Sequence, residues 1–285
     1  MRHLPFQLQK LLTNPPIPLD HNRAEATIRR KSVLVTGAGG SIASSLCRRI
    51  KQFGPKTLIL LEQSENNLYQ IDLDLSADQS GVRLVPVLGD AGDLGLLDNV
   101  FDAYQPDLIF HTAAYKHVPL LERQPLAAIM NNVLGTYNLV NSAIQRRIPR
   151  LIMLSTDKAV NPASIMGASK RVAELMMLGL NSRQCLLTSV RLGNVLGSQG
   201  SVVPRFEEQI RRREPVTVTH PDAARFFMTA DDAVELVLAA WLGTGGDILV
   251  PDLGEPVRII DLANTMIDAA AVDPGSQPPI TFTGL

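Results

Sequence analysis

A glycine-rich loop near the start of the chain has the clearest chemical potential. Residues 36–43 read TGAGGSIA, and they follow a short apolar run and precede a segment with helical periodicity. Glycines permit a tight turn and let backbone N–H groups approach a pyrophosphate, and the N-terminus of the next helix adds a favourable dipole. The pattern therefore predicts phosphate-binding positions at Gly37, Gly39, Gly40, Ser41 and Ile42.

Two carboxylates extend this pattern. Glu62 closes the second apolar run, 19 residues after Ala43, which is the context that a dinucleotide-binding fingerprint requires. A carboxylate there accepts a hydrogen bond from the 2′-hydroxyl of an adenosine ribose and repels a 2′-phosphate, so the sequence favours NAD over NADP. Asp90 ends the third run, where it can reach the adenine, and a role as a helix N-cap is an equal alternative. A plain tight turn in another α/β protein is the alternative interpretation of the loop.

The elements that must position these residues alternate regularly. Short apolar runs, typical of strands buried on both faces, alternate with helical stretches such as 41–53, 65–75 and 127–144. This alternation predicts βαβ units with right-handed crossovers, and hence an α/β fold with a Rossmann-like, doubly wound parallel sheet. The predicted strands are residues 32–36, 57–62, 83–88, 107–112, 150–155 and 185–192.

The same pattern predicts three segments. Pro15, Pro16 and Pro18 break any early helix, so residues 1–30 are expected to be a lead-in segment. Residues 31–195 are the predicted dinucleotide-binding domain. Glycine and proline become frequent beyond it, with short strands at 216–219 and 247–250 and helices at 230–242 and 258–269. Residues 196–285 are therefore predicted to form a smaller α/β substrate-binding lobe.

Composition narrows the possible function classes. The 285 residues include 27 Lys and Arg against 28 Asp and Glu, a net charge of −1, which argues against a protein that binds nucleic acid through phosphate contacts. Two cysteines, Cys47 and Cys185, are too few for a disulfide scaffold or a four-cysteine zinc site, and no metal site is predicted. No run of about 18 residues is apolar throughout, and the N-terminus lacks the features of a signal peptide. We therefore expect a cytoplasmic protein without a transmembrane segment.

Six sequence blocks occur in one order along the chain. They are TGAGGSIA (36–43), HTAAYKHVPLLE (111–122), NNVLGTYNLV (131–140), STDKAVNPASIMGASKR (155–171), VRLGNVLGSQGSVVPRF (190–206) and THPDAARFFMT (219–229). Together they resemble the extended short-chain dehydrogenase/reductase family, and more narrowly its polysaccharide-biosynthesis branch of UDP-N-acetylglucosamine 4,6-dehydratases. The resemblance covers nearly the whole chain. The STDKAVNP block is specific to the branch, whereas the glycine loop is common to the superfamily.

The chain departs from the family pattern at three places. Most short-chain dehydrogenases carry a tyrosine four residues before the active-site lysine, where this chain has Met166 ahead of Lys170. In the branch this methionine marks larger, often membrane-anchored members, which are thought to retain configuration at C5. Those members carry transmembrane helices before the lead-in, so this chain is expected to be either an excised catalytic part, located at the inner face of the membrane, or a short soluble relative. The family also continues beyond the position of Leu285 with a segment that helps to close the nucleotide site, so the substrate lobe is expected to be truncated.

The resemblance implies a redox-neutral loss of water from the sugar. Hydride passes from C4 to NAD, a base removes the acidified C5 proton, an acid protonates the leaving 6-hydroxyl, and hydride returns to C6. Lys158 is the expected base and Asp157 the expected acid, with Thr156 orienting Asp157. Asp157 is also the candidate acceptor of the C4 hydroxyl proton, because Met166 cannot accept one. Lys170 is expected to hold the nicotinamide ribose.

These residues also have simpler interpretations. Asp157 and Lys158 can form a surface ion pair of little energetic value, and Met166 can be a gap-filling core residue. Catalysis needs a neutral Lys158 and a protonated Asp157. The positive charges of the nicotinamide and Lys170 favour the first and burial favours the second, whereas a direct ion pair opposes both. The sequence leaves this balance open.

Contacts to the substrate are implied for other segments. Arginine suits the diphosphate because its guanidinium binds two oxygens at once; Arg225 is the favoured ligand, whereas for Arg191 an ion pair at a strand end is an equal alternative. Lys116 is expected to face the sugar, and Asn132 to brace the loop after the fifth strand. The implied substrate positions are Lys116, Asn132, Arg191, Asn194, Ser201, Val202 and Arg225, with Ala113 and Ala114 beside the cofactor.

Two further features are expected to be structural. His117 is assigned a hydrogen-bonded structural role rather than a catalytic one. The run Arg211–Arg213 is predicted to be the solvated end of a helix, in preference to a membrane-surface site.

The function predicted from all of this is a UDP-N-acetylglucosamine 4,6-dehydratase-like enzyme with bound NAD, feeding surface-polysaccharide or glycan synthesis. One alternative is a UDP-sugar epimerase on the same fold, which uses the hydride step without losing water. Another is a truncated, non-catalytic nucleotide-binding module. Pairing through helices that flank the sheet, which is common in the superfamily, implies a homodimer or a higher homo-oligomer.

Overall fold

The computed structural model describes residues 6–77, 81–270 and 277–284 of the chain, and it contains two compact units. Unit 1 comprises residues 1–16, 193–233 and 252–285, and unit 2 comprises residues 17–192 and 234–251. Neither unit is continuous in sequence. The predicted boundary at 195 lies close to the passage at 192–193, but the return of residues 234–251 to unit 2 was not anticipated.

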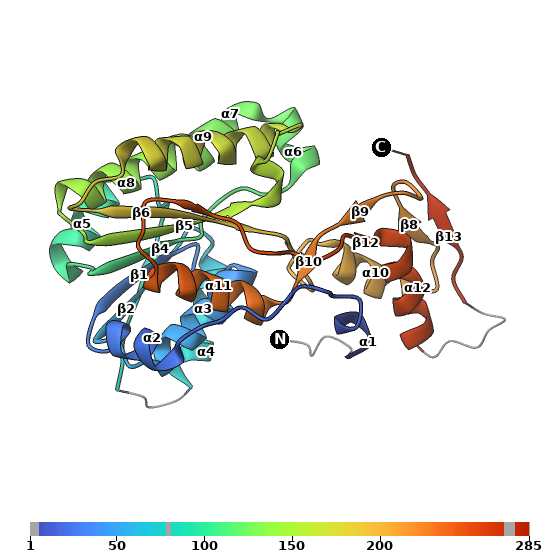
Figure 1. Cartoon of the computed structure of the whole chain (residues 1–285), viewed down its shortest axis with the longest axis horizontal. Helices are drawn as coiled ribbons and strands as arrows, with labels where there is room; N and C mark the ends of the chain where they lie inside the picture. The colour runs from blue at the N-terminus through green and yellow to red at the C-terminus, as the bar shows by residue number, and fades with distance from the viewer. Residues whose placement is uncertain (1–5, 78–80, 271–276, 285) are drawn as a thin grey trace. The chain divides into compact units, whose positions relative to one another are not determined.

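Unit 2 is built on a seven-stranded sheet in which every strand is parallel to its neighbours (Figure 1). Its order is β11-β6-β5-β4-β1-β2-β3. The central strands are buried along their whole length, which is why they read as continuous apolar runs. The predicted Rossmann-like α/β fold is confirmed. The strands are β1 (Ser32–Thr36), β2 (Thr57–Glu62), β3 (Arg83–Leu88), β4 (Leu108–His111), β5 (Arg150–Thr156), β6 (Leu186–Leu192) and β11 (Ile248–Leu249).

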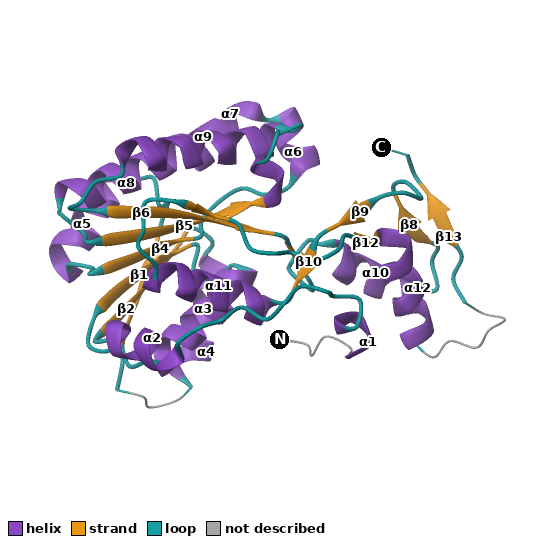
Figure 2. Ribbon diagram, viewed as in Figure 1, coloured by secondary structure: helices purple, strands orange, loops and turns teal. Residues whose placement is uncertain are grey.

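Helices cover both faces of this sheet (Figure 2). On one face lie α2 (His21–Ile28), α3 (Ser41–Gln52), α4 (Glu65–Ser76) and α11 (Ala230–Leu242); on the other lie α5 (Leu94–Tyr104), α6 (Val118–Arg123), α7 (Pro125–Ala128), α8 (Thr136–Gln145) and α9 (Ile165–Leu180). No helix among the described residues is long and apolar enough to cross a membrane.

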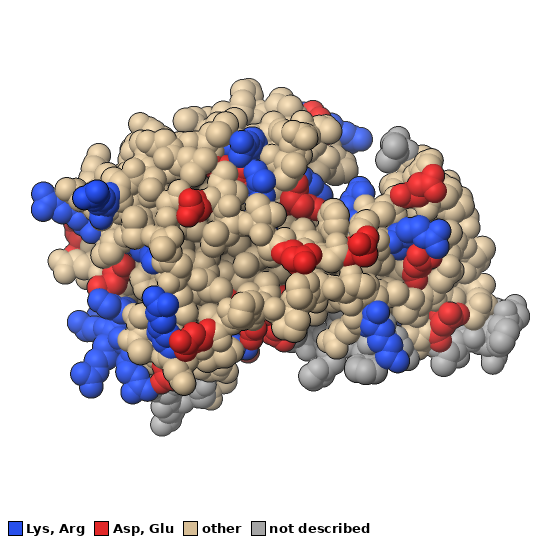
Figure 3. All heavy atoms as spheres, in the orientation of Figure 1, with Lys and Arg blue, Asp and Glu red and all other residues tan. Residues whose placement is uncertain are grey.

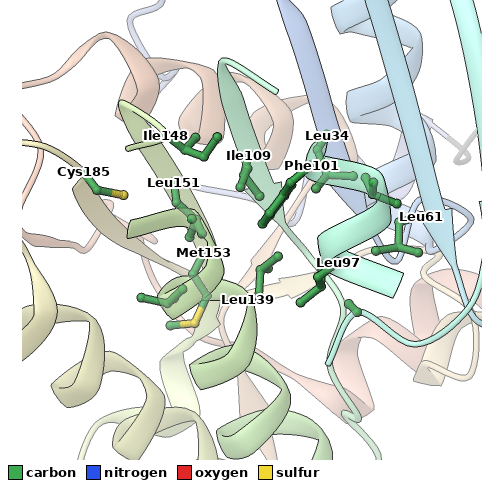
Figure 4. Packing of buried hydrophobic residues seen from close by; sticks show 14 of the residues in the cluster. Leu34, Leu61, Leu97, Phe101, Ile109, Leu139, Ile148, Leu151, Met153 and Cys185 are labelled. Carbon is green, nitrogen blue, oxygen red and sulfur yellow. The ribbon is translucent and has the colours of Figure 1, made fainter. Parts of the chain in front are cut away.

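One apolar core of unit 2 lies between the sheet and the α5, α8 and α9 layer (Figure 4). Phe101 of α5 and Leu139 of α8 pack there against Ile109, Leu151 and other inward-facing strand residues. Burying such side chains contributes about 1.5–3 kcal/mol each. This packing fixes the helices on the strands, and hence the loops at the strand ends.

The helix predicted over 127–144 is interrupted. A π-helical segment, η1 (Ile129–Gly135), lies between α7 and α8. Its side chains give the same apolar pattern as an α-helix, so the sequence carries no signal for it. Such segments add one residue per turn and are frequent at functional sites.

Unit 1 has its own apolar core, formed by α1 (Phe6–Gln9), α10 (Val202–Arg211), α12 (Ile259–Ala269) and several short strands. Leu8 is fully buried there with Phe206 and Leu262, so part of the predicted lead-in belongs to this core. The strands pair as β7 (Asn194–Val195) with β10 (Phe227–Met228), β8 (Val216–Val218) with β13 (Ile280–Phe282), and β9 (Ala224–Arg225) with β12 (Val257–Arg258).

Candidate functional site

Three loops of unit 2 meet at the carboxyl edge of the sheet. They follow β1, β4 and β5, which are adjacent parallel strands. The strand order reverses between β1 and β4, and ligands of doubly wound folds bind outside the carboxyl ends of strands at such a switch point. This edge is therefore the candidate site.

The glycine loop after β1 is shaped by two close approaches. Gly37 has a φ of +65°, and a Cβ there would lie 2.9 Å from the backbone of Ala113 in the loop after β4. A Cβ on Gly39 would lie 2.8 Å from the backbone of Asn67 in α4. Only glycine satisfies both positions. The loop ends at Gly40, the N-cap of α3. Because glycine has no side chain, the N-cap offers no side-chain acceptor to the backbone N–H groups in the first turn of α3.

Glu62 is buried at the end of β2 and is hydrogen-bonded to the glycine loop. Its carboxylate accepts from the Gly39 N–H at 3.1 Å and from the Ser64 N–H at 3.0 Å. The Gly39 amide, predicted to face a phosphate, thus faces a carboxylate in this structure. The bond holds the negative charge of Glu62 against the loop.

Asp90 follows β3 and is exposed. Its carboxylate accepts from the Gly92 N–H at 2.7 Å, within a turn. The alternative prediction that it caps a helix is wrong, because Asp93 is the N-cap of α5 and accepts from the Leu96 N–H at 3.0 Å.

The residues that follow β5 form a compact acid–base group. Thr156 ends the strand, and Asp157 and Lys158 begin the short 3-10 helix η2 (Asp157–Ala159). The Asp157 Oδ1 atom accepts from the Thr156 hydroxyl and from the Lys158 ammonium, each at 2.9 Å. The Asp157 side chain is 18% exposed and that of Lys158 is 30% exposed. The direct ion pair that the sequence left open is therefore present, and it is half-buried.

Lys170 lies on the buried side of α9 and is 4% exposed. Burial lowers the pKa of its ammonium to about 8, although the nearby Glu174 carboxylate opposes this shift. Among the described residues it makes no hydrogen bond and no ion pair. A buried ammonium without a hydrogen-bond acceptor is costly, so this position favours a ligand with oxygen acceptors.

Met166 lies one turn before Lys170 and is 5% exposed. It packs with Leu121 and Ala128 in a small apolar cluster. The simpler interpretation of Met166, as a core residue, agrees with this packing. Its thioether cannot accept a substrate proton, so any such acceptor must come from elsewhere.

Arg191 is committed to a buried partner that the sequence did not single out. Its guanidinium donates two hydrogen bonds of 2.8 Å to Glu174, which has no exposed surface. Glu174 also accepts from Ser155 at 2.7 Å and from Arg171 at 3.0 Å. Burial raises the pKa of Glu174, but the hydrogen bonds from Arg191, Ser155 and Arg171 outweigh this and lower it. The prediction of a direct substrate contact for Arg191 is therefore corrected to an ion pair at a strand end.

Asn132 braces a different loop from the one predicted. It lies in η1 with no exposed surface, and its side-chain amide bonds both backbone groups of Tyr115, the N–H at 2.8 Å and the carbonyl at 3.0 Å. Its Nδ2 also donates to the Ser169 hydroxyl at 3.0 Å. The braced loop follows β4 rather than β5. Both atoms of this buried amide are engaged by protein groups, so Asn132 is a positioning residue.

The rest of the loop after β4 is more open. Ala113 and Ala114 are half-buried beside the glycine loop, and Lys116 is exposed. Partial desolvation nevertheless lowers the pKa of the Lys116 ammonium. His117 is exposed and is the N-cap of α6 without a side-chain capping bond. Its backbone carbonyl accepts from Leu121, and the structural role assigned to its side chain stays a prediction.

The remaining predicted substrate residues belong to unit 1. Asn194 begins β7, Ser201 is the N-cap of α10 and Val202 is its first residue. The Ser201 hydroxyl is buried without a hydrogen-bond partner. Arg225 is exposed on β9. The end of α10 is exposed as predicted, with Arg211 and Arg212 paired to Glu208.

His111 is a second polar residue that sequence reasoning missed. It ends β4, is 2% exposed, and is hydrogen-bonded to Thr36 of β1 at 2.8 Å and to Thr136 of α8 at 2.9 Å. The sequence feature that could have identified His111 is a polar residue at the carboxyl end of an apolar strand. Glu174 had a comparable signal, an acidic residue on the apolar side of a helix, one turn after Lys170.

Comparison with known proteins gives relatives along nearly the whole chain. The chain is 44% identical over 265 residues to the capsular polysaccharide biosynthesis protein CapD of Staphylococcus aureus, covering 92% of this chain and 44% of that protein. It is 43% identical over 281 residues to the probable polysaccharide biosynthesis protein EpsC of Bacillus subtilis, covering 97% and 47%. The chain thus spans less than half the length of these two relatives. It is also 35% identical over 264 residues to a UDP-glucose 4-epimerase of Rickettsia akari, covering 89% and 74%.

Solved structures share the fold. Pen from Bacillus thuringiensis is 30% identical with a TM-score of 0.82, covering 90% of this chain and 81% of that one. The dTDP-glucose 4,6-dehydratase DesIV from Streptomyces venezuelae, solved with NAD bound, is 22% identical with a TM-score of 0.75, covering 89% and 88%. The sequence model of a family described as polysaccharide biosynthesis protein matches residues 33–285. The chain therefore belongs to this polysaccharide-biosynthesis family, a branch of the extended short-chain dehydrogenases/reductases.

Proposed function

We propose that the chain catalyses the NAD-dependent 4,6-dehydration of UDP-N-acetylglucosamine, giving a UDP-4-keto-6-deoxy sugar for surface polysaccharide or glycan synthesis. The observation that carries this proposal is the acid–base pair at the end of β5, where the Asp157 carboxylate and the Lys158 ammonium are hydrogen-bonded at 2.9 Å. An elimination needs an acid and a base close together, whereas a simple C4 epimerization needs no acid for a leaving hydroxyl.

Two observations support NAD as the cofactor. The N-terminus of α3 carries a glycine N-cap without a side-chain cap, which suits a pyrophosphate. The buried Glu62 carboxylate, held at the loop by the Gly39 N–H, suits a free ribose 2′-hydroxyl and disfavours a 2′-phosphate. NAD, when bound, supplies a hydride acceptor and, in its reduced form, a hydride donor.

Lys170 is the proposed ligand for the nicotinamide ribose. Its buried ammonium has no hydrogen-bond acceptor among the described residues, and ribose hydroxyls provide two. This contact gives Lys170 a binding role in the proposed site.

The pair at β5 can reach its reactive form by moving one proton. Transfer from the Lys158 Nζ to the Asp157 Oδ1, along their 2.9 Å hydrogen bond, converts the ion pair into a neutral amine and a carboxylic acid. A bound sugar removes water from this half-buried pair, which favours the neutral form because buried charges are costly. With a ketone at C4, Lys158 would take the C5 proton and return it to C5 when hydride adds to C6, and Asp157 would give its proton to the 6-hydroxyl, which leaves as water. In this sequence the proton of the C4 hydroxyl passes to solvent, and one proton from solvent then restores the Asp157–Lys158 ion pair.

Arg225 is the proposed ligand for the diphosphate of the nucleotide sugar. It is exposed on β9 of unit 1, and its guanidinium donates to the neighbouring Ala224 carbonyl at 2.7 Å. The buried Ser201 hydroxyl at the start of α10, which has no hydrogen-bond partner, is a second proposed polar contact. Asn194 and Val202 stay predictions from the resemblance.

An epimerase is the second candidate, because the chain is 35% identical to the Rickettsia akari UDP-glucose 4-epimerase over 89% of its length. The two candidates differ in mass balance. Incubation of the purified chain with UDP-N-acetylglucosamine and NAD, followed by mass spectrometry, should give a product lighter by one water. In D2O that product should carry a solvent deuteron at C5. An isomer of unchanged mass would establish the epimerase, and no product from a chain that retains NAD would establish the non-catalytic module.

Two variants test the assigned roles. Lys158→Met should lower kcat by roughly 10²–10⁴-fold, the usual contribution of a general base, while NAD binding survives. The matched control is Lys56→Met, which removes an exposed lysine before β2 and should leave kcat unchanged. Equal activity of the two variants would remove Lys158 from the mechanism.

We also propose that unit 2 pairs with a second copy through the α7, η1, α8 and α9 layer. Residues 125–145 contain no Asp, Glu, Lys or Arg, and the surface over these helices is largely uncharged (Figure 3). The exposed apolar side chains on this face are Leu126, Ile129, Met130, Leu134, Tyr137, Val172 and Leu175. Exposed apolar patches of this kind mark protein interfaces. Light scattering should give a dimer mass for the native chain and a monomer mass for Leu126→Glu combined with Leu175→Glu.

A further inference from the structure

A buried chain of hydrogen bonds links the glycine loop to the π-helical segment η1. It runs from Thr36, the last residue of β1, through His111, the last residue of β4, to Thr136, the first residue of α8. These three side chains are 0%, 2% and 0% exposed. From Thr136 the chain continues to the main-chain carbonyl of Asn132 at 2.8 Å.

The direction of this chain follows from counting protons. A carbonyl oxygen only accepts, so the Thr136 hydroxyl proton points to Asn132. The His111 Nε2 atom must then donate to the Thr136 oxygen. A neutral imidazole has one N–H, so its Nδ1 atom accepts the Thr36 hydroxyl proton. The Thr36 oxygen in turn accepts from the Ala113 N–H at 3.4 Å.

Both ends of this hydrogen-bond chain reach the candidate site. At one end, Thr36 immediately precedes Gly37, whose Cα faces the backbone of Ala113. At the other end, the Asn132 amide holds both backbone groups of Tyr115 and the hydroxyl of Ser169. Ser169 is next to Lys170 on α9. This hydrogen-bond chain therefore connects three of the elements that carry proposed dinucleotide contacts, namely the glycine loop, the loop after β4 and α9.

The surroundings of His111 favour the neutral form that the proton count requires. Burial lowers the pKa of the imidazole to about 3, and the positive charge of Lys170 adds to this shift. Lys170, on α9, is the charged group that acts on His111.

We propose that His111 is a positioning residue of the dinucleotide site, acting through a fixed Nε2–H tautomer that orients the buried hydrogen-bond chain between the glycine loop and the Asn132 brace. The opposite tautomer would require the Thr136 proton at Nε2 and would break the bond from Thr136 to the Asn132 carbonyl. The Tyr115 loop and the α9 segment that carries Lys170 would then lose a fixed support. The inference rests on the proposed function for the identity of the ligand, but not for the tautomer itself.

The first test is spectroscopic and uses the native chain without ligand. In ¹⁵N-labelled protein at pH 7, the histidine correlation spectrum should show His111 with a protonated Nε2 and an unprotonated Nδ1. The assignment comes from the signal that disappears in a His111→Phe sample or, if that variant does not fold, from sequential through-bond assignment. An Nδ1–H tautomer or an imidazolium at pH 7 would overturn the proposal.

The second test separates hydrogen bonding from packing at Thr136. Thr136→Ser keeps the hydroxyl and loses a methyl group, whereas Thr136→Val keeps the shape and loses the hydroxyl. We expect Thr136→Val to raise the dissociation constant for NAD about tenfold, the size of one buried hydrogen bond, and to speed hydrogen exchange of the Tyr115 amide. Thr136→Ser should stay close to the native values in both measurements.

The opposite order, with Thr136→Val native-like and Thr136→Ser impaired, would assign Thr136 to packing and overturn the proposal. If Thr136→Val does not fold, the proposal is decided by the tautomer of His111 measured in the native protein. The hydrogen exchange of Tyr115 and the tautomer of His111 can both be measured without NAD. If the protein shows the expected exchange and the expected tautomer but binds no NAD, the proposed function is refuted and the positioning role of His111 is not. If the native chain binds NAD with the wrong tautomer, the positioning role alone fails.

Discussion

Replacing Glu174 by glutamine should destabilise unit 2 strongly. The side chain has no exposed surface and accepts four hydrogen bonds, from Ser155, from Arg171 and twice from Arg191. Glutamine has nearly the same shape but no charge, and its amide N–H₂ would point at a guanidinium that is itself a donor. Arg191 is 13% exposed, so solvent cannot replace the lost partner.

The size of the effect follows from this geometry. Removing one partner of a buried ion pair costs about 3–5 kcal/mol, because the remaining charge stays desolvated and unpaired. Arg171→Gln is the matched control. Its side chain is 36% exposed and donates one bond of 3.0 Å, and Arg191 still neutralises Glu174 in that variant. A loss of at most about 1 kcal/mol is expected there.

Urea unfolding measures both variants, followed by fluorescence of Trp241, the single tryptophan of the chain. Trp241 donates to the Thr27 hydroxyl at 2.9 Å within unit 2, so its signal reports that unit. Glu174→Gln should also lower the pKa of Lys170 further, because the Glu174 carboxylate now raises it. A free-energy change below 1 kcal/mol for Glu174→Gln, or one equal to that of Arg171→Gln, would refute this account of the buried network.

Three further predictions concern single positions. Acidification from pH 7 to pH 5 should lower the free energy of unfolding by about 2 kcal/mol through His111 alone. The pKa of His111 is about 3 in the folded state and 6.5 in the unfolded state, so only the unfolded state gains a proton in this range. His111→Phe should therefore flatten this part of the pH profile measured by urea unfolding. Gly39→Ala should lower the free energy of unfolding by about 1–3 kcal/mol in the same assay, because its Cβ would meet the Asn67 backbone at 2.8 Å. The control is Gly179→Ala in α9, whose Cβ would meet nothing within 4 Å, and it should raise the free energy of unfolding by about 0.5–1 kcal/mol. Lys170→Met should raise the melting temperature of the NAD-free chain, since it removes a buried ammonium, and weaken NAD binding in calorimetry; a variant that binds NAD as tightly as the native chain would contradict the assigned role.

The strands were predictable because local sequence determines them. A strand covered on both faces must be apolar throughout, so β1 and β2 coincide with the predicted runs 32–36 and 57–62. The edge strand β3 also coincides with its predicted run, 83–88, although it is only partly buried. The glycine loop was equally readable, since its backbone geometry excludes other residues at Gly37 and Gly39. The strands depend on neighbours within a few residues. The two glycines are required by Ala113 and Asn67, which are distant in sequence, but the glycine pattern itself is local and could be recognised without knowing these partners.

The remaining features depend on partners that are distant in sequence. Arg191 and Glu174 are 17 residues apart on different elements, and the sequence could not choose between an ion pair and a phosphate contact for the arginine. The loop that Asn132 braces was misassigned for the same reason. The π-helical turn that carries Asn132 has no compositional signature, because it results from an inserted residue rather than from a residue type.

The interrupted course of the chain through unit 2 has a consequence for biosynthesis. When β6 leaves the ribosome, its neighbour β11 does not yet exist, because residues 193–247 must be translated first. At roughly 5–20 residues per second this delay lasts about 3–11 seconds. Throughout that time the middle of β6, Ser189 and Val190, is an open sheet edge, the kind of surface that chaperones shield and that nascent chains use to aggregate. Slow translation across residues 193–247 would lengthen this exposure, so yield in the cell should depend on codon choice in that segment.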